Sequence, residues 1–331
     1  MSNCKSVLLA LLLAVASAAG AGAAEAEAMP ELRLGLVKFG TAAWIVDTIR
    51  THGFDKSAGI ALATVDLATP AAGEVALQAG GVDAIFVDWL WVSRQRRAGQ
   101  KITFIPRSTA LGEILVADSS PIRRLADLDG RRLGVAGGPL DKSWLLLRAY
   151  GRRTLGHDLG RSLEPVFGAP PLLSQELIDG RVDAVLTYWP FAARLAARGY
   201  RTLVSMHDVL AGVGFDPPVA LNGYAVSETW IANHPGALQR FLAADAAAGR
   251  LLASDDAEWR RLAPLTGAEN DAVLVALRDR FRAGQVIGVV GAGEVDRAQR
   301  LFALLAEDGG ADLTGGATAL APGTFWQETP P

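Results

Sequence analysis

Short apolar runs alternate with longer amphipathic runs along most of the sequence after residue 30. The apolar runs predict β-strands over residues 32–37, 61–66, 83–87, 102–105, 113–117, 132–136, 183–187, 201–205 and 220–227. The amphipathic runs predict α-helices over residues 42–52, 90–98, 141–150 and 172–179, a helix that begins at Thr69 and Pro70, and helices from residue 235 onward. Strands that alternate with helices favour an α/β fold with mainly parallel sheets and helices on both faces.

An internal repeat divides this pattern into two similar halves. Residues 80–91 and 180–191 both read Gly-x-Val-Asp-Ala followed by a short apolar run, and they place Trp89 and Trp189 at matching positions. Upstream of these segments, Trp44 is matched by Trp144 in the same register. A repeat of this length predicts two similar lobes, each of which offers tryptophans at equivalent places.

The repeat also indicates how the chain is divided between the lobes. We assign residues 30–110 and 228–331 to lobe 1 and residues 111–227 to lobe 2, and we expect the C-terminal helices to cover lobe 1. The chain then crosses between the lobes twice, near residues 111–116 and 222–227. A double crossing is a natural hinge, because a few residues absorb the change in backbone angles when two lobes move.

The first residues have the pattern of an export signal. Lys5 supplies a positive charge, residues 7–19 are small or apolar, and residues 21–23 offer a small-residue cleavage pattern. We therefore predict a cleaved signal peptide over residues 1–26. The alternative is an uncleaved membrane anchor, which needs about 18 to 20 apolar residues, more than this run contains.

Composition excludes several classes of function. The chain has 331 residues, of which 50% are hydrophobic and 20% charged, and its net charge of −3 is spread over mixed acidic and basic positions. A chain of this length and apolar content buries a large core and forms about two globular units. Because no basic stripe is available to hold a phosphate backbone, nucleic acid is not expected as a partner.

The sequence contains few of the residues and motifs that usually bind metals or carry out catalysis. The single cysteine, Cys4, precedes the apolar run, so the mature chain would contain no thiol for a disulfide, a nucleophile or a metal site. The four histidines lack the spacing of metal ligands, and the sequence contains neither a Gly-x-Ser-x-Gly elbow nor a Walker phosphate loop. We therefore expect neither an enzyme nor a bound cofactor or metal.

Several segments in a fixed order carry a resemblance to a known family. These are Asp-Ser-Ser-Pro-Ile at 118–122, Leu-Ala-Asp-Leu-Asp-Gly at 125–130, the repeat segments 80–89 and 180–189, and residues 226–241. Together they resemble the periplasmic solute-binding proteins of ABC importers. The most similar subgroup is the NMT1/THI5-like one, which serves nitrate, taurine, aliphatic sulfonates and thiamine-pyrimidine precursors.

The resemblance implies a two-lobed, type II-like periplasmic binding protein fold. It further implies a monomer in the periplasm that captures one small solute in the interlobe cleft and delivers it to an inner-membrane permease. Two alternatives stay open. One is a ligand-sensing periplasmic partner of a receptor, which needs the same closure. The other is a THI5-like pyrimidine-synthesis enzyme, although that group carries a cysteine-rich iron-binding stretch that this sequence lacks.

Candidate ligand-binding residues follow from the rule that ligands of open α/β sheets lie beyond the carboxyl ends of the strands. The loops after the predicted strands, the first turns of the helices that follow them, and two acids near the cleft, Asp88 and Glu113, give thirteen candidates: Lys38, Phe39, Gly40, Thr41, Trp44, Asp88, Trp89, Glu113, Gly138, Asp141, Trp144, Tyr188 and Trp189. For the tryptophans the alternative is core packing. For Asp88 it is a helix cap, and for Glu113 it is a solvated strand edge.

The candidate residues also bear on the charge of the ligand. Aromatic walls stack on rings or surround a cationic head group. An anion instead needs free amides at a helix N-terminus with a basic residue nearby, which Lys38 and Thr41 could provide in lobe 1. In lobe 2, Asp141 would itself accept the hydrogen bonds of the first-turn amides of its helix, and it would place a negative charge where an anion would have to bind. We therefore hypothesise a neutral or cationic organic ligand, such as an aminopyrimidine or an alkylammonium compound.

Overall fold

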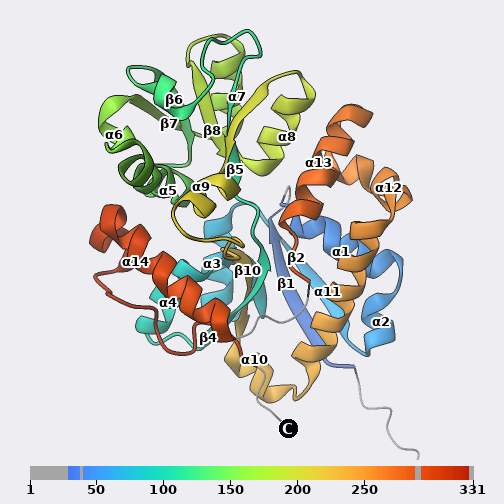
Figure 1. Cartoon of the computed structure of the whole chain (residues 1–331). Helices are drawn as coiled ribbons and strands as arrows, with labels where there is room; N and C mark the ends of the chain where they lie inside the picture. The colour runs from blue at the N-terminus through green and yellow to red at the C-terminus, as the bar shows by residue number, and fades with distance from the viewer. Residues whose placement is uncertain (1–28, 38–39, 288–291, 328–331) are drawn as a thin grey trace, which may run out of the picture.

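Two five-stranded sheets form the centres of two lobes in the computed structural model, which describes residues 29–37, 40–287 and 292–327 (Figure 1). The sheet of lobe 1 has the order β2 (Ala61–Leu67), β1 (Glu31–Val37), β3 (Ala84–Asp88), β10 (Asn222–Ser227) and β4 (Ile102–Ser108). The sheet of lobe 2 has the order β7 (Glu164–Gly168), β6 (Arg132–Ala136), β8 (Ala184–Tyr188), β5 (Gly112–Val116) and β9 (Arg201–Ser205). The two-lobed α/β fold expected from the repeat is confirmed.

The two sheets share one topology. In each, the fourth strand in the order is antiparallel to both of its neighbours, and the other described pairings are parallel. These antiparallel strands, β10 and β5, each enter the sheet directly after the chain leaves the other lobe. Because β10 lies in the sheet of lobe 1, the expected boundary of lobe 2 at residue 227 is wrong, and the second crossing ends before Asn222.

The crossing strands each need a glycine near their start. A Cβ atom on Gly112 would lie 2.0 Å from the carbonyl oxygen of Thr187, and one on Gly223 would lie 2.0 Å from that of Ile105. Any side chain at either position would therefore clash with the backbone of the neighbouring strand. The first crossing spans residues 109–111, between β4 and β5, and the second spans residues 213–221.

Helices cover both faces of each sheet. Those of the first half are α1 (Ala42–Thr51), α2 (Phe54–Ala58), α3 (Pro70–Gln78) and α4 (Trp89–Arg97). Lobe 2 contains η1 (Leu125–Leu128), α5 (Lys142–Tyr150), η2 (Gly151–Leu155), α6 (Leu159–Ser162), α7 (Pro170–Ile178), α8 (Trp189–Ala197) and α9 (Met206–Gly212). The C-terminal part forms α10 (Glu228–Asn233), α11 (Ala237–Ser254), α12 (Asp256–Thr266), α13 (Asp271–Gly284) and α14 (Ala292–Thr314). Among the described residues, no helix is both long enough and apolar enough to cross a membrane.

The C-terminal helices contact both lobes. The prediction that they cover lobe 1 alone is therefore wrong. Helix α13 packs along α8 of lobe 2, and α14 packs against both α4 of lobe 1 and α5 of lobe 2 (Figure 1). Asp308 on α14 accepts two hydrogen bonds from Arg152, at 2.9 and 2.7 Å, and lies 3.3 Å from Arg148. The C-terminal segment therefore joins the two lobes.

One hydrophobic core continues from lobe 1 into lobe 2. It contains residues of α4 and β4, the inner face of α14, and residues of α5 and α9. A second core lies mainly within lobe 1 beneath α1, α11 and α12 and reaches α8 of lobe 2 through Ala193, and a third lies within lobe 2 beneath α7 and α8. The α14 side of the molecule is thus held by apolar burial, which is the main source of folding free energy.

Candidate ligand-binding site

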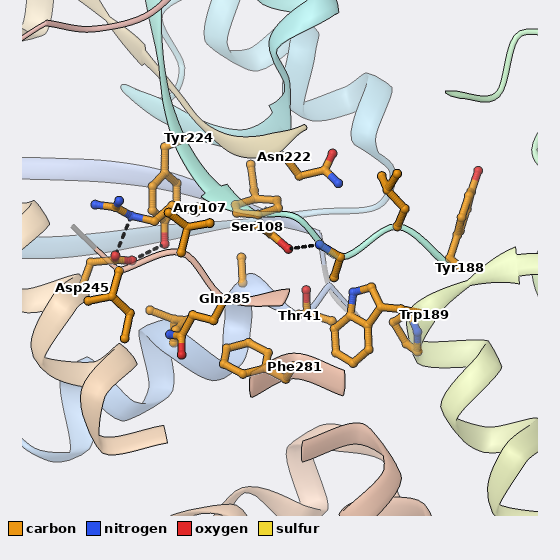
Figure 2. A pocket seen from close by; sticks show the side chains of 18 of the residues that line it. Thr41, Arg107, Ser108, Tyr188, Trp189, Asn222, Tyr224, Asp245, Phe281 and Gln285 are labelled. Carbon is orange, nitrogen blue, oxygen red and sulfur yellow. Dashed lines mark hydrogen bonds and ion pairs between the residues drawn. The ribbon is translucent and has the colours of Figure 1, made fainter. Parts of the chain in front are cut away.

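A cavity of about 320 Å³ lies between the lobes, at the edge where the parallel strands end (Figure 2). Lobe 1 lines it with residues from the start of α1, from β3, β4 and β10, and from α11 and the end of α13. Lobe 2 lines it with the first residues of α5 and of α8. A cavity of this size that receives side chains from both lobes suits one small molecule.

Aromatic rings form much of its wall. Phe86, Tyr224 and Phe281 come from lobe 1, and Tyr188 and Trp189 come from lobe 2. Several of these rings also contact one another, since Phe86 and Tyr224 lie edge to face with centroids 5.5 Å apart. Rings in such contacts keep their orientation, so they present fixed apolar faces to a ligand.

A buried ion pair stands in the wall contributed by lobe 1. Arg107 Nε lies 2.7 Å from Asp245 Oδ2, and the hydroxyl of Tyr224 donates to Asp245 Oδ1 over 2.8 Å (Figure 2). Burial and the neighbouring carboxylate raise the pKa of Tyr224 well above its ordinary value. The phenol therefore stays protonated and serves as a hydrogen-bond donor, which helps to hold Asp245 in place.

Asp141 marks the corresponding wall of lobe 2. Its Oδ1 accepts the amide of Ser143 over 2.9 Å and caps α5, as predicted. Its Oδ2 accepts the hydroxyl of Tyr188 over 3.1 Å. Desolvation nevertheless raises the pKa of Asp141, despite the opposing effects of Lys142, Tyr188 and the amides. The carboxylate is thus only partly compensated by its protein partners.

Lys142 of lobe 2 carries the second positive charge of the cavity wall and forms an ion pair with Asp88 of lobe 1. Its Nζ donates to Asp88 Oδ2 over 2.7 Å, and Asp88 Oδ1 accepts the amide of Trp91 over 3.0 Å, which caps α4. Burial alone would raise the pKa of Asp88, but the charge and hydrogen bond of Lys142, together with the amide of Trp91 and the charge of Arg94, outweigh it and lower the pKa. This ion pair joins lobe 1 to lobe 2 beside the cavity.

Every charged side chain that lines the described cavity therefore has a protein partner. Arg107 is paired with Asp245, Lys142 with Asp88, and Asp141 with the hydroxyl of Tyr188. Within the part of the chain that the structure describes, no group of three His, Cys, Asp or Glu side chains could hold a metal ion. The arrangement is that of an interlobe pocket with aromatic walls, in which each charged side chain contacts a partner in the protein.

Four of the predicted site residues line this cavity: Thr41, Asp141, Tyr188 and Trp189. Gly40 and Gly138 lie in adjacent loops without lining it, and Lys38 and Phe39 lie outside the described residues. Trp44 is only 4% exposed and lies one layer behind, with its ring 5.8 Å from that of Trp189.

Asp88 and Glu113 face other side chains of the protein. Asp88 is held by Lys142, as described above. Glu113 accepts hydrogen bonds from Thr202 on the neighbouring strand and from Arg280 on α13, so it forms an ion pair between the lobes. The expectation that these two acids face the ligand is not supported by the structure, which gives both of them interlobe partners.

Trp89 and Trp144 were expected at the cleft and lie in the hydrophobic core instead. They are 0% and 3% exposed, and neither lines the cavity. The ring of Trp89 lies 6.2 Å from that of Phe325 in the C-terminal segment, and the ring of Trp144 lies 6.0 Å from that of Phe167. Trp89 thus differs from its equivalent, Trp189, because the segment after α14 packs against it.

The sequence reasoning missed most of the polar residues of the cavity. Arg107 and Ser108 end β4, and the rule on strand ends would have selected them had it been applied to that strand. Asn222 starts β10, which is antiparallel, so its first residue lies at the same edge as the last residue of β3. Asp245 is an acidic residue on the buried face of an alanine-rich helix, and that position is itself a signal.

Phe281 and Gln285 carried no local signal, because their approach to the cavity depends on how α13 packs across the lobes.

Solved structures share this fold. The periplasmic aliphatic sulphonate binding protein SsuA from Escherichia coli has 21% identity and a TM-score of 0.74, with 91% of this chain and 93% of that chain covered. The alkanesulfonate-binding protein SsuA from Xanthomonas axonopodis pv. citri, bound to MOPS, has 20% identity and a TM-score of 0.67, with 90% and 98% covered. The desulfurization enzyme DSZB has 20% identity and a TM-score of 0.58, with 86% and 92% covered. At these identities the likeness concerns the fold.

No curated protein matches the chain. The family model described as NMT1/THI5 like matches residues 48–255, a segment that includes both chain crossings and most of the cavity wall. This match confirms the resemblance stated from the sequence motifs. The chain belongs to the NMT1/THI5-like family.

Proposed function

We propose that this protein is the periplasmic solute-binding component of an ABC transporter, and that it captures a small organic solute between its lobes and delivers it to a membrane permease. The observation that carries the proposal is the cavity of about 320 Å³ between the lobes, lined by both of them. A ligand that touches two lobes at once binds the closed form better than the open form. That difference in affinity is what drives closure.

The ligand we propose is neutral or cationic. Asp141 already accepts the hydrogen bond of the Ser143 amide at the start of α5. Both cations of the cavity wall are already paired with carboxylates. An anion would have to displace one of these partners. A positive or hydrogen-bond-donating group would instead complete the partly compensated carboxylate of Asp141, while the rings of Trp189 and Phe281 cover its apolar part.

Calorimetric titration of the mature protein tests this proposal. Choline, an aminopyrimidine, taurine and an alkanesulfonate form a panel that separates charge from size, and small-angle scattering on the same samples reports closure. We expect binding of a neutral or cationic member, with a smaller radius of gyration in its presence. Tight binding of the alkanesulfonate would contradict the assigned ligand charge, and no binding by any member would argue against capture of this solute class.

A catalytic function has one observation in its favour, since the enzyme DSZB shares the fold. A fold by itself does not decide between binding and catalysis. Binding is favoured here because each charged group of the cavity is engaged by a protein partner. Turnover of a panel member during titration, detected by mass spectrometry, would favour the enzyme. The sensing alternative is distinguished by neighbouring genes, with a permease and an ATPase indicating uptake and a histidine kinase indicating sensing.

A further inference from the structure

The two cations of the cavity wall are neutralised in different ways. Arg107 and Asp245 both line the cavity and both come from lobe 1. Lys142 lines the cavity from lobe 2, whereas its partner Asp88 comes from lobe 1 and does not line the cavity. The Asp88 carboxylate thus binds Lys142 from outside the cavity. Because the two residues belong to different lobes, this contact requires the lobes to be together.

The surroundings of Lys142 leave Asp88 as its principal counter-charge. Its ammonium group also feels the negative charge of Asp141 and the positive charge of Arg94, and it donates its hydrogen bond to Asp88 over 2.7 Å. The side chains of Lys142 and Asp88 are 30% and 15% exposed. At this burial an ion pair is screened less than on the surface, so removal of one charge changes the field inside the cavity.

We propose that Asp88 determines the charge selectivity of the site by neutralising Lys142, whose ammonium group it binds from outside the cavity. This inference rests on the proposed function, because it concerns the ligand of the same cavity. An anion bound to Lys142 would compete with Asp88 for the ammonium group. It would therefore break a contact between the lobes and oppose the closure that a ligand has to stabilise.

Asp88 can be neutralised with little damage to the fold. Its second role is to cap α4 through the amide of Trp91, and asparagine caps a helix as well as aspartate does. The variant Asp88→Asn therefore keeps the cap and removes the charge. Asp88→Ser, which also keeps a capping oxygen, provides a second variant if the first one folds poorly.

The experiment compares propanesulfonate with methyl propyl sulfone, an uncharged analogue of similar shape, by calorimetry at several salt concentrations. We expect the wild type to bind propanesulfonate weakly and Asp88→Asn to bind it about tenfold to a hundredfold more tightly, the range for one hydrogen bond to a charged group. The gain should shrink as salt increases and should disappear in Asp88→Asn combined with Lys142→Met. The affinity for the sulfone should change little in any of these proteins.

Three outcomes would overturn the inference. They are equal sulfonate affinity in the wild type and both Asp88 variants, absence of sulfonate binding in every variant, and a gain that persists without Lys142. Failure of the proposed function would look different, because the wild type would then bind no neutral or cationic solute. A lysine-dependent gain of sulfonate affinity in Asp88→Asn would support the role of Asp88 even in that case.

Discussion

Trp89 and Trp189 occupy equivalent places in the two halves of the sequence and have different roles. Each follows the last residue of a central strand, and each donates its backbone amide to a leucine carbonyl at a chain crossing, Leu221 for Trp89 and Leu111 for Trp189. The Trp89 side chain is fully buried in the core that joins the lobes. The Trp189 side chain is partly exposed and lines the cavity.

This difference predicts opposite effects of the same substitution. Trp89→Ala should lower the free energy of unfolding by about 3 to 5 kcal/mol, because it leaves a large cavity in the core. Trp189→Ala should cost less stability and should weaken binding of whichever panel solute the wild type binds. Urea denaturation and calorimetry measure the two effects. Equal losses of stability in both variants would mean that Trp189 is a core residue.

At the scale of elements, Thr41, Thr69 and Asp141 each precede a helix and are of types that commonly cap one, but only two of them do so. Thr69 accepts the amide of Ala72 over 3.1 Å, and Asp141 accepts the amide of Ser143. Thr41 precedes α1 without a side-chain cap hydrogen bond and lines the cavity instead. A residue type that commonly caps helices is therefore available for ligand binding in lobe 1.

A matched pair of threonine variants tests this assignment. Thr69→Ala should reduce the free energy of unfolding by about 1 kcal/mol, the usual cost of losing a cap. Thr41→Ala should change it by less than about 0.5 kcal/mol, because no cap is lost. Only Thr41→Ala should alter solute affinity in calorimetry. A larger loss of stability in Thr41→Ala than in Thr69→Ala would contradict the assignment.

The contact between α1 and α12 includes one buried carboxylate beside the edge-to-face contact of Trp44 with Trp259. Glu258 accepts hydrogen bonds from Thr48 over 2.9 Å and from Arg261 over 2.6 Å, and it lies 3.0 Å from His52. The Arg261 hydrogen bonds, together with those of His52 and Thr48, outweigh desolvation and lower the pKa of Glu258 from 4.5 to about 2. The carboxylate is therefore ionised in the folded protein at a pH where it would be protonated in the unfolded chain.

The lowered pKa predicts a loss of stability in acid. The contribution is present above pH 4.5 and is lost as the pH falls from 4.5 to about 2. Glu258→Gln should thus be less stable than the wild type by about 3 kcal/mol at neutral pH, with the difference shrinking towards pH 2. Urea denaturation across this pH range measures it. A difference that does not depend on pH would show that the side chain acts through packing.

For the whole molecule, the lobes meet through two contacts of different character. On the α8–α13 side, Arg194 donates to the carbonyl oxygens of Thr266 and Gly267, Arg198 pairs with Glu269, and Arg280 pairs with Glu113. On the α5–α14 side, the Asp308 ion pairs lie beside a continuous apolar core. The core on the α14 side contains many side chains of lobe 2, whereas on the α8–α13 side, among the described residues, only Ala193, Trp189 and Ala197 of α8 pack against the lobe 1 core. Because a smaller apolar contact costs less to separate, the α8–α13 side is the one that should open.

Two charge-removing variants distinguish these contacts. Glu113→Gln should shift the ligand-free protein towards the open form, lowering the ratio of closed to open molecules by about tenfold for the loss of one charged hydrogen bond. Its radius of gyration in small-angle scattering should increase. Asp308→Asn should lower the Tm and leave the radius of gyration unchanged. An increase of the radius in Asp308→Asn alone would place the opening on the α14 side.

Local pattern was sufficient for much of the fold. The apolar runs at 132–136 and 201–205 coincide with β6 and β9, and the repeat indicated the two similar lobes that the two sheets form. Local pattern predicted the strand β10 but assigned it to the wrong lobe, because hydrogen bonds to β3 and β4 decide which sheet it joins. Local pattern likewise could not separate Trp89 from Trp189, because both follow the same kind of strand.

What the sequence by itself determined was most of the strands and helices (but not β7), the two-lobed repeat, the family, and four residues at the strand ends that line the cavity. These follow from periodicity and from residues close together in the chain. Only the tertiary structure decided which tryptophans are buried, how Asp88 meets Lys142, and that Asp245 and Phe281 reach the cavity. Those contacts join residues far apart in the chain, and the packing of the C-terminal helices across both lobes brings them together.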